Sequence, residues 1–211
     1  MCMLNGQPVT AINPKAEDNP FPDLWSTYLA SDDLDATAAK DKEAGSQFLM
    51  EPMDVMGSGR LAFAMDPTGA PYGIWQAGEH TGVGVYNGPG ALFWNESMTR
   101  DYEGAKNFYN TVFGFTYDEV GQGSSYSMIK RAGDGQVVAG LGKLDASTPA
   151  QVHPSWVTYF MVQDCDASAA KAAELGATIV GQPSETPAGR LACLIGAQGE
   201  AFSLIQTQSE Q

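Results

Sequence analysis

The sequence predicts an α+β protein built from repeated βαβββ modules, and three observations lead to this expectation. The segment WSTYL at 25–29 recurs about 130 residues later as WVTYF at 156–160. The segment GRLA at 59–62 recurs in the same way at 189–192. Between these markers, each copy has the pattern of a short strand, an amphipathic helix and a three-stranded meander.

The third module shows this order most clearly. A strand is expected over 91–98, and Asp101 is placed to cap a following helix. Residues Ala105, Phe108, Tyr109 and Val112 fall on one helical face, and Gly114 is expected to end the helix. Strands are then expected over 115–120, 126–130 and 137–141, the last two joined by a glycine-rich hairpin turn.

The second and fourth modules follow the same order. The second predicts a strand over 26–30, a helix over 35–44 that ends before Gly45, and strands over 47–50, 60–65 and 72–75. An Asp66-Pro67-Thr68-Gly69 turn precedes the last strand. The fourth module repeats the pattern from Val157 to Ile205.

The first copy is expected to lack roughly 40 residues that the second copy has at its start, leaving a half-module before three whole modules. We therefore expect an incomplete N-terminal domain over 1–77, a glycine-rich linker over 78–89 and a complete C-terminal domain over 90–211. The incomplete domain would expose a sheet edge and apolar surface around Val9, Ala11 and Ile12. Such a surface predicts a homo-oligomer through this domain.

The charge of the chain limits its partners. Lysine and arginine number 11 against 25 aspartate and glutamate residues, which gives a net charge of −14. This charge would repel nucleic acid and anionic membrane surfaces, so neither is expected as a partner. Three scattered cysteines and the absence of a signal-like start are typical of a cytoplasmic protein, although a start that precedes Met1 would leave export open.

Two motifs give a more specific resemblance. Asp101 followed by the segment AKNFYNTVFGF at 105–115 resembles a signature of the vicinal oxygen chelate (VOC) superfamily, which includes glyoxalases, bleomycin-resistance proteins and extradiol dioxygenases. The Asp66 to Gly69 turn resembles a second motif of that superfamily. Segments at 51–56, 73–77 and 92–96 are similar to actinobacterial tandem VOC proteins of glyoxalase-like type, including the mycobacterial culture-filtrate antigen type.

This resemblance implies a fold and a set of metal positions. Two βαβββ modules would form a cupped mixed sheet whose concave face holds a ligand. Metal-using members carry ligands on the first and last strands of a module, and the matching positions here are Ser26, Trp94, Val157, Gly73 and Ser203. None of these side chains is a good metal ligand. We therefore expect no cofactor, although a divalent metal with an altered ligand set remains an alternative.

The two-residue period of a strand predicts which side chains face the cup. Its lining is expected to combine aromatic, sulfur and hydroxyl side chains with one acid: Ser26, Tyr28, Trp94, Glu96, Met98, Val157, Tyr159 and Met161. An apolar cavity with one polar handle suits a planar or hydrophobic small molecule, although aromatic residues also fill ordinary cores.

Glu96 is the candidate catalytic residue. Burial among apolar neighbours would raise its pKa toward the range of a general base. The alternative is a structural role, in which Glu96 bonds to a neighbouring strand or pairs with Arg60 or Arg190. The leading hypothesis is a small-molecule binding protein of VOC type; the second is a glyoxalase-like lyase or isomerase that acts on an aldehyde- or carbonyl-containing molecule with Glu96 as base.

Overall fold

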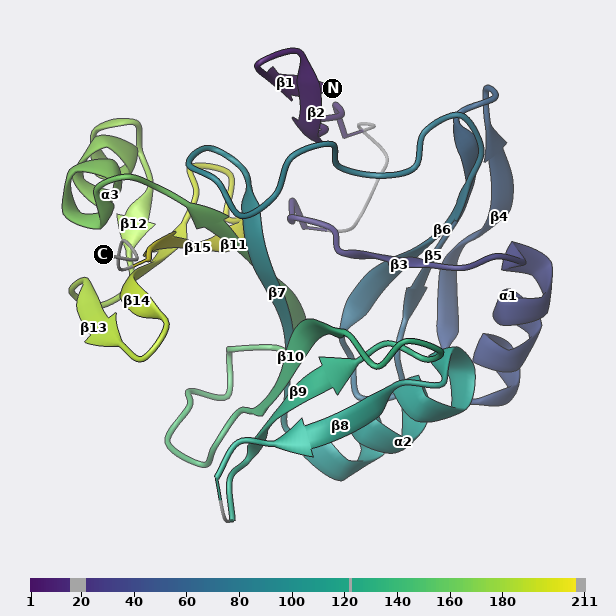
Figure 1. Cartoon of the computed structure of the whole chain (residues 1–211). Helices are drawn as coiled ribbons and strands as arrows, with labels where there is room; N and C mark the ends of the chain where they lie inside the picture. Colours follow the sequence, from purple (N-terminus) through teal and green to yellow (C-terminus); the bar gives the residue numbers. More distant parts are fainter. Residues whose placement is uncertain (16–21, 122, 208–211) are drawn as a thin grey trace. The chain divides into compact units, whose positions relative to one another are not determined.

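The computed structural model describes residues 1–15, 22–121 and 123–207 (Figure 1). The chain forms two compact units. The first contains residues 1–25, 82–94 and 157–211, and the second contains residues 26–81 and 95–156. One boundary, after Thr81, falls inside the predicted linker. The two units are defined by which residues contact one another in space, whereas the expected domains 1–77, 78–89 and 90–211 follow from the sequence repeat. The domain bounds therefore stay a prediction.

Three modules share one strand order. In each, the first strand pairs in parallel with the last strand, and the last strand pairs antiparallel with its predecessor. The second module consists of β3 (Tyr28–Ala30), α1 (Leu34–Glu43), β4 (Gln47–Val55), β5 (Gly59–Met65) and β6 (Pro71–Ala77). The third consists of β7 (Leu92–Thr99), α2 (Tyr102–Phe113), β8 (Thr116–Glu119), β9 (Tyr126–Lys130) and β10 (Val137–Lys143).

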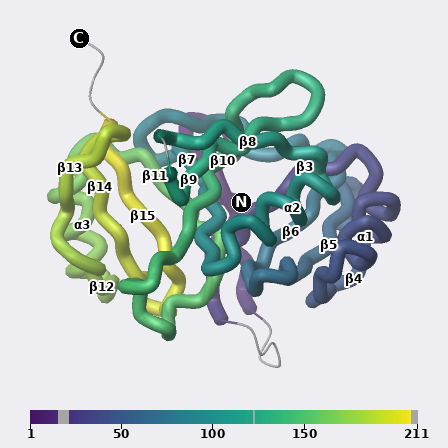
Figure 2. The backbone as a smooth tube through the Cα atoms, turned by 90° about the horizontal axis from the view of Figure 1, so that it is seen from below, coloured from purple at the N-terminus to yellow at the C-terminus, as the bar shows by residue number. Residues whose placement is uncertain are grey.

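The first unit carries the remaining elements. Its N-terminal hairpin is formed by β1 (Cys2–Leu4) and β2 (Gln7–Thr10). The fourth module consists of β11 (Ser155–Met161), α3 (Cys165–Glu174), β12 (Thr178–Ile179), β13 (Ser184–Thr186), β14 (Gly189–Ile195) and β15 (Ala201–Gln206). Helix α3 packs on β14 and β15 (Figure 2). The α+β class is therefore confirmed, and the second and third modules have the βαβββ order. In the fourth module four strands follow the helix, because two short strands, β12 and β13, both pair with β14.

The predicted helix boundaries agree closely with the structure. Asp33, Asp101 and Asp164 cap the three helices, each side chain accepting a backbone N–H three residues later. Gly114 ends α2 in the left-handed conformation, with φ of 70°. The strand expected over 47–50 is longer than predicted. In the structure β4 continues to Val55, because it still pairs with β5 beyond register shifts on either side of Met50.

The repeated sequence makes the same contacts twice. The Gln76 side chain accepts the Leu34 N–H at 2.9 Å, and the Gln206 side chain accepts the Cys165 N–H at 2.9 Å. In both modules a glutamine side chain of the last strand thus accepts the backbone N–H of the first residue of the helix. The recurring residues hold each helix start to the last strand of its own module.

Helices α1 and α2 share one core in the second unit. Tyr72 of β6 lies edge-on to Phe108 and Tyr109 of α2, with ring centroids 6.2 and 5.8 Å apart. Tyr72 and Tyr109 are fully buried. Edge-to-face aromatic contacts of this kind add to the free energy gained by burying the rings. The second and third modules therefore form a single packed unit rather than two separate cores.

A buried polar network crosses this core. The Asp66 carboxylate, which begins the predicted turn, accepts the Tyr109 hydroxyl at 2.7 Å and the Ala70 N–H at 3.0 Å. The Trp156 indole N–H donates to the Tyr109 oxygen at 2.8 Å. The Asp66 side chain thus ties a turn of the second module to the helix of the third.

The N-terminal hairpin departs from expectation at one residue. Ile12 is 69% exposed, and Ala11 is exposed as well, as predicted for an apolar edge. Val9 is instead buried, and the carbonyl of neighbouring Pro8 accepts the Gly84 N–H at 2.7 Å. The expected exposure of Val9 was therefore wrong: the segment after Thr81 pairs with this strand at the neighbouring Pro8. Among the described helices, none is long and apolar enough to cross a membrane.

Candidate functional site

Strand β7 presents two different faces. Ser97 and Thr99 are fully buried, whereas Glu96 and Met98 are only partly buried. This alternation follows the two-residue period of a strand. Glu96 and Met98 therefore share the face of the sheet that lies opposite the core, as the sequence predicts.

Glu96 has a tyrosine partner that lies two strands away. The Tyr126 hydroxyl, on β9, donates to the Glu96 carboxylate at 2.9 Å. Strand β10 lies between them, with Gly140 opposite Glu96 and Gly142 opposite Tyr126. The tyrosine side chain therefore lies diagonally across β10 to reach the acid.

Glycine on β10 makes this contact possible. A Cβ atom at Gly140 would lie 2.0 Å from the Tyr126 hydroxyl oxygen and 3.1 Å from the Glu96 Cβ. At Gly142 it would lie 2.6 Å from the Met98 sulfur and 3.1 Å from the Tyr126 ring. Any larger residue at either position would displace the side chains that pack over it. The two glycines form the floor beneath Glu96, Tyr126 and Met98.

The second module has a similar glycine floor with an aromatic cover. The Tyr28 ring lies over Gly73, where an added Cβ atom would come within 2.3 Å of the ring. Tyr28 also lies edge-on to Phe63 and Trp75, at centroid distances of 6.1 and 6.4 Å. Its side chain remains 46% exposed. This face of the β3–β6–β5 sheet is therefore aromatic and accessible.

The other predicted site residues divide between the units. Ser26 belongs with Tyr28 to the second unit and is exposed. Trp94, Val157, Tyr159 and Met161 belong to the first unit, where all four are half-buried. The structure brings Glu96 and Met98 together on one face and places Tyr28 on the other sheet of the same unit.

The two arginines proposed as partners of Glu96 have other partners. Arg60 bonds Asp35 at 2.8 Å and approaches Asp54 at 3.2 Å. Arg190 pairs with Asp166 and Glu185. Of the structural alternatives for Glu96, the hydrogen bond to a nearby strand is present, whereas Arg60 and Arg190 form ion pairs with other acids.

The side chains around the expected metal positions do not fit a metal ion. Among the described residues, no three or more histidine, cysteine, aspartate or glutamate side chains are placed to share one. Gly73 stands at a last-strand ligand position, and the Tyr28 ring occupies the space that a ligand side chain would need there. In the third module, the Glu96 carboxylate accepts a bond from the Tyr126 hydroxyl, which lies over Gly140.

Several residues of this site were not predicted from the sequence. Tyr126, Gly140 and Gly142 complete the surroundings of Glu96, and Phe63 and Trp75 complete those of Tyr28. The alternation in Gly140-Leu141-Gly142 was a usable signal, because it places two glycines on one strand face. Finding Tyr126 would also have required the register between β9 and β10.

The comparisons with known proteins agree with this fold. The family model of the Glyoxalase/Bleomycin resistance protein/Dioxygenase superfamily matches residues 92–202. A relative from Mycobacterium bovis, named "Putative glyoxylase CFP32", is 39% identical over 216 residues, covering 100% of this chain and 81% of the relative. This chain therefore belongs to the glyoxalase, bleomycin-resistance and dioxygenase (VOC) superfamily.

Another relative is the anthracycline biosynthesis protein DnrV of Streptomyces peucetius. It is 34% identical over 193 residues, which cover 92% of this chain and 69% of DnrV. Among solved structures, the Mn(II)-bound glyoxalase from Novosphingobium aromaticivorans has a TM-score of 0.55 at 16% identity. This similarity covers 85% of this chain and 61% of that one.

The fold is shared with a dioxygenase as well. The 2,2',3-trihydroxybiphenyl 1,2-dioxygenase from Sphingomonas wittichii has a TM-score of 0.54 at 14% identity, covering 88% of this chain and 71% of that one. At such identities the solved structures establish the fold alone. The activity has to be argued from the side chains of this chain.

Proposed function

We propose that this protein binds a planar, largely hydrophobic small molecule without using the metal centre of its metal-dependent relatives. The observation that carries the proposal is the Glu96–Tyr126 pair above Gly140. The Tyr126 hydroxyl donates its one proton to Glu96 at 2.9 Å, so the remaining carboxylate oxygen and the phenol oxygen would accept hydrogen bonds from a hydroxyl or N–H group of the ligand.

The surroundings of the pair suit a flat apolar ligand. Met98 lies beside Glu96 on the same face, and its thioether adapts to irregular shapes. Gly140 and Gly142 let the Tyr126 side chain pack closely over β10, where its ring would support a flat ligand. DnrV is named for anthracycline biosynthesis, so a polycyclic aromatic molecule of the anthracycline type is a reasonable first ligand to test.

A titration of the protein with an anthracycline tests this proposal. Quenching of the ligand fluorescence should report saturable binding by the wild type, and Glu96→Gln should weaken binding by roughly tenfold or more, because a charge-assisted hydrogen bond contributes about 1.5–3 kcal/mol. Glu119→Gln is a matched control, since this β8 acid pairs with Lys106 of α2 at 3.2 Å and lies opposite the buried Ser127, on the other face of the sheet. Equal ligand affinities of the wild type and Glu96→Gln would contradict the proposed role of Glu96 in binding.

The alternative is a glyoxalase-like lyase or isomerase, which the relative named as a glyoxylase favours. In that mechanism the Glu96 carboxylate takes a proton from the carbon next to a substrate carbonyl, and the Tyr126 hydroxyl orients the carboxylate. Turnover of methylglyoxal–thiol adducts by the wild type, lost in Glu96→Gln, would favour this alternative over binding alone.

A further inference from the structure

The Tyr28 hydroxyl is an unused polar group on the aromatic face of the second module. The ring lies over Gly73 beside Phe63 and Trp75, but within the part of the chain that the structure describes its hydroxyl has no hydrogen-bond partner. Burial of part of the ring raises the pKa of the Tyr28 phenol, so the group stays protonated at neutral pH. A protonated phenol without a protein partner can donate to a ligand.

Tyr28 and Glu96 open to the same side of the second unit. The Thr27 hydroxyl donates to the side-chain oxygen of Asn95 at 3.0 Å, which joins the start of β3 to β7. This bond lies on the core side, since Thr27 is buried. Side chains alternate along a strand, so Tyr28 and Glu96, each the next residue, both face away from the core.

The two groups have complementary hydrogen-bonding roles and lie apart. Glu96 and Tyr126 are bonded to each other and present acceptors, whereas Tyr28 presents a donor. The Tyr28 ring lies over Gly73 of β6, beyond β3 from Glu96 on β7. A ligand that reaches both groups must span about two strand spacings, on the order of 10 Å. That span requires a fused-ring system rather than a single ring.

Strand β4 extends the apolar face on which such rings would lie. Met50 is paired with Phe63, and Met53 is paired with Leu61, so these residues share one face of the β4–β5 pair. Both methionines are nearly half exposed. Methionine side chains adapt to the outline of a ligand, and the rings of Phe63 and Tyr28 offer flat surfaces.

We infer that Tyr28 determines ligand specificity: its hydroxyl donates to a carbonyl oxygen of a planar fused-ring molecule whose hydroxyl or N–H group is held by Glu96. This inference rests on the proposed binding function and narrows its ligands to hydroxy-carbonyl compounds. A molecule that lacks the carbonyl keeps the contact with Glu96 and the ring contacts. It loses only the hydrogen bond from Tyr28.

Two probes with the same three rings test this role. 2-Hydroxyanthraquinone carries carbonyl groups, and 2-hydroxyanthracene carries none. In titrations followed by quenching of the protein fluorescence, Tyr28→Phe should weaken binding of the quinone by about fivefold, the contribution of one neutral hydrogen bond, and leave binding of the anthracene unchanged. Tyr28→Leu removes the ring as well and should weaken binding of both probes.

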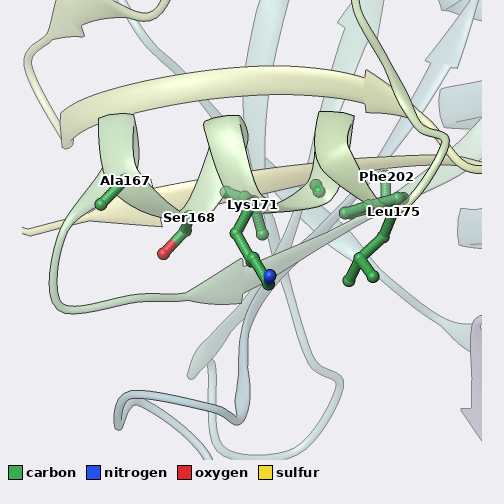
Figure 3. Close-up of a pocket in the computed structure, with 7 residues that line it drawn as sticks. Ala167, Ser168, Lys171, Leu175 and Phe202 are labelled. Atoms are coloured by element: carbon green, nitrogen blue, oxygen red, sulfur yellow. The ribbon is translucent and has the colours of Figure 1, made fainter.

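Two control variants address other sites. Tyr86→Phe removes the hydroxyl of an exposed tyrosine in the first unit and should change neither affinity. Leu175→Asp alters an open apolar groove of about 440 Å³ along α3 in that unit, where Leu175 and Phe202 are among the lining residues (Figure 3). This variant should also leave both affinities unchanged, because the groove lies outside the second unit.

The outcomes separate the role of Tyr28 from the binding function itself. If Glu96→Gln weakens binding of both probes but Tyr28→Phe affects neither, or affects both equally, the inference is overturned and the binding function stands. If the wild type shows no saturable binding of either probe, the proposed function fails, and the inference fails with it. Binding lost in Leu175→Asp and kept in Tyr28→Phe would place the ligand on α3 and also overturn the inference.

Discussion

Replacing Asp66 by alanine should lower the free energy of unfolding by about 3–4 kcal/mol, one of the largest effects of any single change in this chain. The Asp66 side chain is 3% exposed and accepts bonds from the Tyr109 hydroxyl and from the backbone of Thr68 and Ala70. Alanine would leave these donors buried without an acceptor, and that desolvation cost is not recovered. Urea denaturation followed by circular dichroism measures the change.

Asp145 provides a matched control for this prediction. Its carboxylate accepts the Ser147 N–H at 2.7 Å and the Thr148 N–H at 3.0 Å, in a turn like that of Asp66, but it lies at the surface. Asp145→Ala should therefore cost much less, since water can replace the lost acceptor. Similar losses in both variants would show that the turn, and not the link to α2, accounts for the role of Asp66.

The second large effect is expected at Gly140. A methyl group there would meet the Tyr126 hydroxyl oxygen at 2.0 Å, so Gly140→Ala must push the tyrosine away from Glu96. Overpacking of this kind costs about 1–3 kcal/mol. In a Tyr126→Ala background the obstructing ring is gone, and most of this cost should disappear. A double-mutant cycle on unfolding free energies should give a coupling of about 1–2 kcal/mol between the two positions.

Gly88 is the control for this cycle. Its backbone is not left-handed, and an added Cβ atom there would meet nothing within 4 Å. Gly88→Ala should change stability little and should not couple to Tyr126→Ala. If Gly140→Ala lowers the free energy of unfolding by the same amount with and without the Tyr126 ring, then Gly140 is not required to accommodate the tyrosine.

Local sequence signals predicted much of this fold. The Asp101 cap and the Gly114 end of α2 could be identified because capping depends on a few neighbouring residues. The faces of β7 followed from alternation alone, which placed Glu96 and Met98 together. The repeat gave the order of elements, because copies of one module fold alike.

Long-range contacts could not be predicted in the same way. Tyr126 reaches Glu96 only because the register of β9, β10 and β7 sets them diagonally across two glycines, and a single sequence does not fix that register. Likewise, the bond from Tyr109 to Asp66 joins residues of two modules through packing of α2. The grouping of the second and third modules into one unit depends on the same packing.

We propose that Tyr126 and Gly140 stand beside Glu96 where metal-using relatives would hold a metal ion. Elemental analysis of the protein, after incubation with zinc, nickel and manganese and exhaustive dialysis, tests it most directly. We expect far less than one metal ion per chain, in the wild type and in Glu96→Gln alike, because within the described residues no three histidine, cysteine, aspartate or glutamate side chains are placed to share an ion. One ion retained per chain by the wild type and lost in Glu96→Gln would contradict it.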